Sequence, residues 1–141
     1  MKLFEKLFGK KKEMSPTQRV RGIMQHFVEA SHVGMDASRL QTPEHGQTYL
    51  TYMFGAVDML CQMHQLDDAK TVGLFQGLLE NLLGDYSPEE AKQLTQVVLR
   101  ASSTPDGQRI MTEGGESIRM WISGATLAPH RLQELLSEID A

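Results

Sequence analysis

Two pairs of residues have a spacing that could place metal ligands on one face of a helix. Glu29 and His32 are three residues apart, as are Cys61 and His64, and residues at that spacing are neighbours on a helix surface. A di-iron bundle needs two Glu-x-x-His pairs and two further carboxylates, and a zinc site needs four ligands. Neither set can be completed, because Cys61 is the only cysteine and no second Glu-x-x-His pair occurs. We therefore expect no metal and no other cofactor.

The histidines of these pairs have simpler interpretations. His32 falls, with His26, Glu29 and Asp36, opposite the apolar face of the first expected helix, and such a face usually contacts solvent. His64 comes at the end of the second expected helix, where a histidine can bind the last carbonyl groups. The sequence thus predicts a solvated polar face and a capping histidine.

Catalysis by a buried carboxylate is a further possibility. Asp58 interrupts the most apolar stretch of the chain, residues 49–63. On a helical wheel it shares a narrow polar arc with Gln47, Thr51 and Gln62, so we expect it just outside the core. A Ser-His-Asp or Cys-His catalytic set cannot be recognised from the separation of its residues along the chain, because such sets are defined by their geometry. The sequence favours a protein that is not an enzyme.

The N-terminal segment gives the strongest indication of a binding function. Residues 1–13 carry five lysines and two glutamates, a net charge of +3, whereas residues 14–141 carry −7. In a helix its large apolar residues would share one face, a pattern typical of segments that bind a lipid surface or a groove on a protein. The residues expected to bind a membrane or a partner are Lys2, Leu3, Phe4, Lys6, Leu7, Phe8, Lys10, Lys11 and Lys12.

Three uses of this segment stay open: binding at an interface, packing on the body of the same chain, and no contact at all. Burial of its four large side chains would contribute about 6 kcal/mol, and the ordering of the segment consumes most of that energy. We therefore expect residues 1–14 to form a basic amphipathic tail and hinge that docks weakly, and residues 15–141 to form a separate helical domain.

Proline marks most of the expected helix starts. Proline at the first helical position loses no hydrogen bond, and a preceding hydroxyl can accept one from the first turn. Ser15 with Gln18 and Ser87 with Glu90 also have the spacing of a capping box. The five prolines, the first four of them preceded by Ser or Thr, are Pro16, Pro43, Pro88, Pro105 and Pro129.

Apolar residues recur with helical spacing after each start. The expected helices run from 16 to about 36, from 43 to about 65, from 68 to near 84, and onward from 88, 105 and 129. Adjacent Gly114 and Gly115 cost about 2 kcal/mol in a helix relative to alanine, so the fifth helix either continues through them or breaks there. Strand signals are nearly absent. The predicted fold class is all-α, a single compact bundle of five to six helices with a short amphipathic N-terminal segment.

Small and flexible side chains suggest how this bundle packs. Gly55, and Gly73 with Gly77, would allow neighbouring helices to approach closely. The second expected helix has a wide apolar arc, which indicates a central position. Its methionines fill a core more often than they line a binding groove. The width of the arc also makes a homodimer possible.

Composition narrows the class of protein. Because the body is acidic, we expect no nucleic-acid binding. Residues 49–63 are too short to cross a bilayer, the N-terminal apolar cluster does not fit a secretory signal, and a single cysteine suggests a cytoplasmic, reduced setting. The leading hypothesis is a non-enzymatic cytosolic interaction module recruited to an anionic membrane surface or a larger assembly through its tail. The alternative is an acidic inhibitor, immunity-type or chaperone-like protein whose body binds a basic protein.

Overall fold

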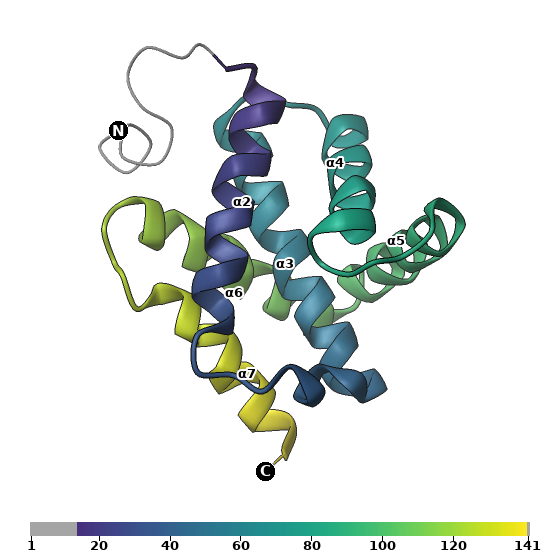
Figure 1. Cartoon of the computed structure of the whole chain (residues 1–141), viewed down its shortest axis with the longest axis vertical. Coiled ribbons are helices and arrows are strands. Elements are labelled where there is room, and N and C mark those ends of the chain that lie inside the picture. Colours follow the sequence, from purple (N-terminus) through teal and green to yellow (C-terminus); the bar gives the residue numbers. More distant parts are fainter. Residues whose placement is uncertain (1–13, 141) are drawn as a thin grey trace.

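The computed structural model describes residues 14–140, and these residues fold into six α-helices and two short 3₁₀ helices (Figure 1). The predicted all-α class is therefore confirmed. The helices are α2 (Pro16–His32), α3 (Pro43–Met63), α4 (Asp68–Asn81), α5 (Pro88–Ser102), α6 (Pro105–Ile122) and α7 (Arg131–Asp140), and the 3₁₀ helices are η1 (Ala37–Gln41) and η2 (Ala128–His130).

Capping side chains explain where most of these helices begin. Ser15 and Ser87 form complete capping boxes at α2 and α5, as their spacing predicts. Thr42 and Thr104 accept hydrogen bonds from the first turns of α3 and α6, and each is followed by a proline. Asp67 caps α4 in the same way. The local sequence therefore determines these starts, because each cap satisfies a backbone N–H that the helix itself leaves unpaired.

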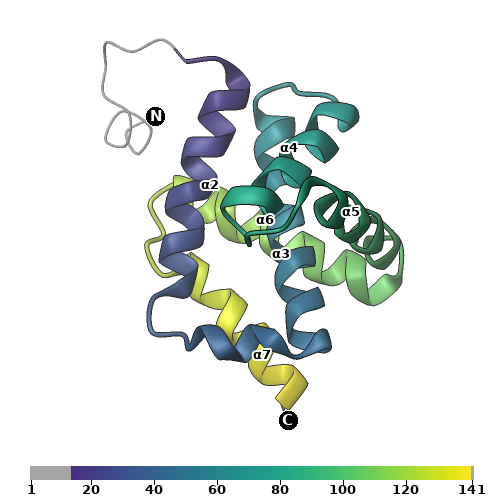
Figure 2. The same cartoon turned by 45° about the vertical axis from the view of Figure 1, so that its right-hand side comes forward.

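The second predicted helix is central, as its wide apolar arc indicated. α3 passes through the middle of the bundle, with α2 and α5 on opposite sides of it (Figures 1 and 2). Residues 48–57 of α3 are buried without interruption. The apolar face of α3 is thus buried within its own chain. The width of its apolar arc therefore gives no argument for a homodimer, and the homodimer itself stays a prediction.

Two glycines allow α3 and α6 to cross closely. A Cβ atom added at Gly55 would lie 1.9 Å from the carbonyl oxygen of Met111, and one added at Gly114 would lie 1.9 Å from that of Tyr52. α6 is one continuous helix through Gly114 and Gly115. The expected close approach is confirmed at Gly55 but is wrong at Gly73 and Gly77 in α4, where an added Cβ would meet open space.

Several boundaries differ from the expected ones. α2 ends at His32 because the chain turns at Gly34, whose φ of +77° suits glycine. The following residues form η1, which the sequence pattern did not predict. At the C-terminus, Pro129 lies in η2, and α7 starts two residues later. These differences affect only short connecting segments.

The tail residues lie outside the described part of the chain. The predicted membrane- or partner-binding residues 2–4, 6–8 and 10–12, and the expected boundary between tail and domain, therefore stay predictions. Among residues 14–140, none of the helices is both long and apolar enough to cross a membrane.

Candidate functional site

Two grooves border the N-terminal half of α3. The first, which we call the apolar groove, has a volume of about 260 Å³ and lies between η1, the start of α3 and α5. The second, the polar groove, has a volume of about 310 Å³ and lies between α3, the start of α6 and the end of α7. Pro43 and Gln47 border both grooves. The apolar groove and the polar groove therefore adjoin at the start of α3.

The apolar groove is lined by side chains from four separate segments. α3 contributes Leu50 and α5 contributes Leu94 and Val98, while η1 contributes Leu40 and the α4–α5 connection contributes Tyr86. Leu50 and Val98 belong to the core, so the groove opens directly onto it.

Its rim exposes apolar surface to solvent. Val97 is 42% exposed and Tyr86 is 37% exposed, although both are large apolar or aromatic residues. Such residues at the edge of a hollow are typical of surfaces that bind another protein. A second exposed pair, Met120 and Leu127, lies beside a smaller hollow between α6 and η2.

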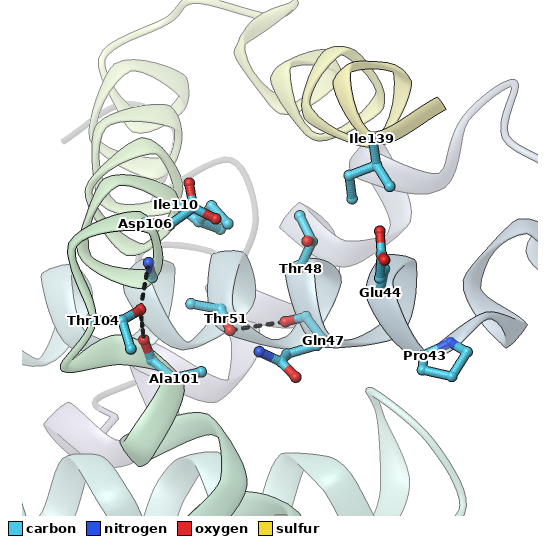
Figure 3. Close-up of a pocket in the computed structure, with 11 residues that line it drawn as sticks. Pro43, Glu44, Gln47, Thr48, Thr51, Ala101, Thr104, Asp106, Ile110 and Ile139 are labelled. Carbon is cyan, nitrogen blue, oxygen red and sulfur yellow. Dashed lines mark hydrogen bonds between the residues drawn. The ribbon is translucent and has the colours of Figure 1, made fainter. Parts of the chain in front are cut away.

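Figure 3 shows that the polar groove is lined by hydroxyl and carboxylate side chains. The Thr51 hydroxyl donates to the Gln47 carbonyl oxygen at 2.8 Å. The Thr104 hydroxyl donates to the Ala101 carbonyl oxygen at 2.7 Å and accepts from the Gly107 N–H at 3.0 Å. These hydroxyls are thus engaged by the helix backbone.

Two carboxylates line the polar groove. Glu44 enters from the first turn of α3 and Asp106 from the first turn of α6. Asp106 accepts two hydrogen bonds from Arg109 of the next turn. No histidine lines this groove among the described residues. The arrangement can hold a small polar molecule, and its threonine hydroxyls at positions 51 and 104 are bound to helix backbone rather than to these carboxylates.

A hydroxyl, an imidazole and a carboxylate are joined in series near the apolar groove. The Thr42 hydroxyl contacts Nδ1 of His45, and Nε2 of His45 lies 2.8 Å from Oδ1 of Asp140 in α7. The same order occurs in catalytic triads. Here, however, Thr42 Oγ1 also accepts the His45 N–H as the cap of α3, and the His45 ring is buried. The series joins the ends of α3 and α7, so we assign it a structural role.

Ion pairs extend this connection. Arg39 of η1 donates to Asp140 at 2.8 Å, and the neighbouring Arg39 and His45 hold the pKa of the Asp140 carboxyl below its usual value. Arg131 at the start of α7 binds Glu113 of α6, which raises the pKa of the guanidinium. Both ends of α7 are therefore anchored to other elements.

The candidate ligands from the sequence have structural contacts instead. Nδ1 of His64 lies 2.8 Å from the Leu60 carbonyl oxygen at the end of α3, which confirms the capping interpretation. Cys61 is buried, and desolvation raises the pKa of its thiol. Asp58 is half-buried and accepts from Gln62 at 2.8 Å, while desolvation raises its pKa.

His32 differs from its predicted solvated position. Its Nε2 lies 2.9 Å from the hydroxyl of Tyr49 in α3, and the ring is half-buried. Desolvation lowers the pKa of His32. The helical wheel missed this contact because the end of α2 leans against α3, so part of its polar side is also covered. Within residues 14–140, no group of three or more potential ligands is placed to hold a metal ion.

The sequence did not identify the apolar groove. Leu94, Val97 and Val98 have the apolar character expected of the packing side of the helix that starts at Pro88, and in the structure Leu94 and Val98 are at least partly buried. The adjacent pair Val97 and Val98 carried no signal either, because adjacent helical residues such as Ile23 and Met24 are both buried elsewhere in this structure. Tyr86, just before the proline start of α5, gave no signal of its own.

Comparisons with protein-family models, with curated proteins and with solved structures give no match to this chain.

Proposed function

We propose that this protein is a non-enzymatic helical interaction module whose body binds a protein segment in the apolar groove. The observation that carries the proposal is the exposure of Tyr86 and Val97 on the rim of a hollow that opens onto core residues. A groove of this kind accepts the apolar side of an amphipathic helix. Its volume of about 260 Å³ is below the about 300–1,000 Å³ usual for small-molecule sites.

The non-enzymatic part of the proposal is supported by the hydrogen bonds of the polar residues. Thr42, Thr51 and Thr104 each use their hydroxyl groups to bind helix backbone or, in the case of Thr42, a buried imidazole. A nucleophile in these positions would have to break a helix cap or a backbone contact before it could react.

The groove is tested by affinity capture with the full chain. Val97→Glu places a charge on the rim, and Met120→Glu is the matched control because Met120 is similarly exposed, at 46%, on α6. We expect the unchanged chain and Met120→Glu to capture the same partner. Val97→Glu should reduce the amount of captured partner at least tenfold. Equal recovery by all three chains would contradict the proposal.

The tail is proposed to recruit the module to an anionic membrane surface or a larger assembly. This part rests on the amphipathic and basic pattern of residues 1–13. In vesicle co-sedimentation, the full chain should bind phosphatidylserine-containing vesicles more strongly than phosphatidylcholine vesicles. Phe4→Glu with Phe8→Glu should remove that preference. Equal partitioning of the two chains would eliminate the lipid version.

A basic protein partner is the second candidate, because the surface beside the apolar groove is acidic. Residues 80–90 contain four carboxylates and no lysine or arginine. This segment contains Tyr86 and the first turn of α5. If the body binds a basic partner, higher salt should slow association, and the double substitution in the tail should leave capture intact.

A further inference from the structure

We infer that the apolar groove receives the N-terminal segment of a second copy of this chain, with Leu3, Phe4, Leu7 and Phe8 facing the groove. The inference rests on the proposed role of the groove as a docking surface, and it names the occupant. Three features support it: the match in polarity, the match in charge and the reach of the tail.

The polarity and charge of the two surfaces are complementary. The groove presents Leu94, Val97 and Tyr86, and the acid-rich residues 80–90 adjoin its Tyr86 end. Residues 1–13 combine large apolar side chains with a net charge of +3. Oppositely charged surfaces favour encounter and fix the register of docking.

Charges around the groove also define the direction of the docked segment. At the η1 end, Arg39 already binds Asp140, and Arg100 lies one turn beyond Val97 on α5. Asp85 and Glu89 at the Tyr86 end are exposed. The lysines at 10–12 should therefore lie toward Tyr86, where they meet the carboxylates.

The reach of the tail excludes the groove of its own chain. α2 and α3 are antiparallel, because His32 at the end of α2 contacts Tyr49 near the start of α3. The 17 residues of α2 place its start about 24 Å from that contact, and α5, which lines the groove, lies on the opposite side of α3 from α2 (Figures 1 and 2).

Ser15 is fixed as the cap of α2, and a helical segment that ends at Phe8 lies seven residues before it, a separation of at most about 25 Å. That length only equals the distance along α2, and it leaves nothing for the path across α3. Leu3, Phe4, Leu7 and Phe8 share one face only in a helix, so they cannot all enter this groove from within the same chain. A second copy has no such restriction, and reciprocal exchange of the two tails closes a two-fold dimer.

Complementation between two full-length variants tests the inference. Val97→Glu blocks the groove and leaves the tail intact, whereas Phe4→Glu with Phe8→Glu alters the tail and leaves the groove intact. By sedimentation equilibrium, we expect the unchanged chain to self-associate with increasing concentration and each variant to remain monomeric. A mixture of the two variants should form a 1:1 complex, because one supplies the tail and the other the groove.

Matched controls separate this contact from general surface effects. Met120→Glu should self-associate like the unchanged chain, and Glu89→Lys should weaken association at least threefold at low salt. Circular dichroism checks that each variant is folded. If Val97→Glu does not fold, the tail variant still shows whether self-association requires the tail.

A monomeric unchanged chain, self-association that survives the tail substitutions, or a mixture without complex would each overturn the inference. Failure here is distinct from failure of the proposed function. A monomeric chain that still captures a partner through Val97 retains the docking function with a different occupant.

Discussion

Gly114 of α6 lies so close to Tyr52 of α3 that a Cβ atom at position 114 would come within 1.9 Å of the Tyr52 carbonyl oxygen. Because that oxygen belongs to the backbone of a buried helix, it cannot move away as a flexible side chain could. We predict that Gly114→Ala lowers the free energy of unfolding by about 3 kcal/mol through overpacking. Urea denaturation followed by circular dichroism measures this change.

Gly73→Ala in α4 is the matched control. An added Cβ at Gly73 meets no atom within 4 Å, and alanine favours a helix over glycine by about 1 kcal/mol. This variant should be as stable as the unchanged protein or slightly more stable. If Gly114→Ala were equally stable, the close crossing of α3 and α6 would be wrong.

Cys61 should react slowly while the protein is folded. Its thiol is buried in the core and burial raises its pKa, so both access and the thiolate fraction are low. With a disulfide reagent at pH 8, the rate should rise steeply once urea unfolds the chain. Fast reaction of the native protein would show that the end of α3 opens without global unfolding.

Protonation of His32 should destabilise the fold. Burial lowers its pKa from the model-peptide value of 6.5, so at mildly acid pH the unfolded chain binds more protons than the folded one. The free energy of unfolding should therefore fall as the pH drops below about 6.5. His32→Gln should show a smaller loss between pH 7 and pH 5 in thermal unfolding.

His26→Gln, on the same helix, is the control for this pH dependence. It should lose stability on acidification as the unchanged protein does. If both variants behaved alike, the burial of His32 would not be the source of the effect.

The helix starts could be predicted because their causes are local. Ser15 and Ser87 bind N–H groups only three residues away, so a few adjacent letters contain the whole interaction. The continuity of α6 through Gly114 could not be predicted in the same way. Its cause is the backbone of α3, more than fifty residues earlier in the chain, and the intrinsic cost of two glycines pointed equally to a break.

The candidate site depends even more on tertiary structure. The apolar groove exists because η1, α3 and α5 meet, and η1 itself was not expected. Val97 looked like a core residue because helical periodicity shows which side of a helix is apolar but not how much of that side a neighbour covers. The tail, in contrast, was predicted from its net charge and from the spacing of its apolar residues, and it lies outside the residues that the structure describes.

Photo-crosslinking from position 97 tests the role of the apolar groove most directly. Val97 is replaced by p-benzoylphenylalanine in the full chain, and the same residue at Met120 is the control. Irradiation of an equal mixture of ¹⁴N- and ¹⁵N-labelled chains should give products between copies that join position 97 to residues 1–13, with little product from position 120. Equal yields at the two positions, or no product between copies at position 97, would contradict the docking of a second copy's tail in this groove.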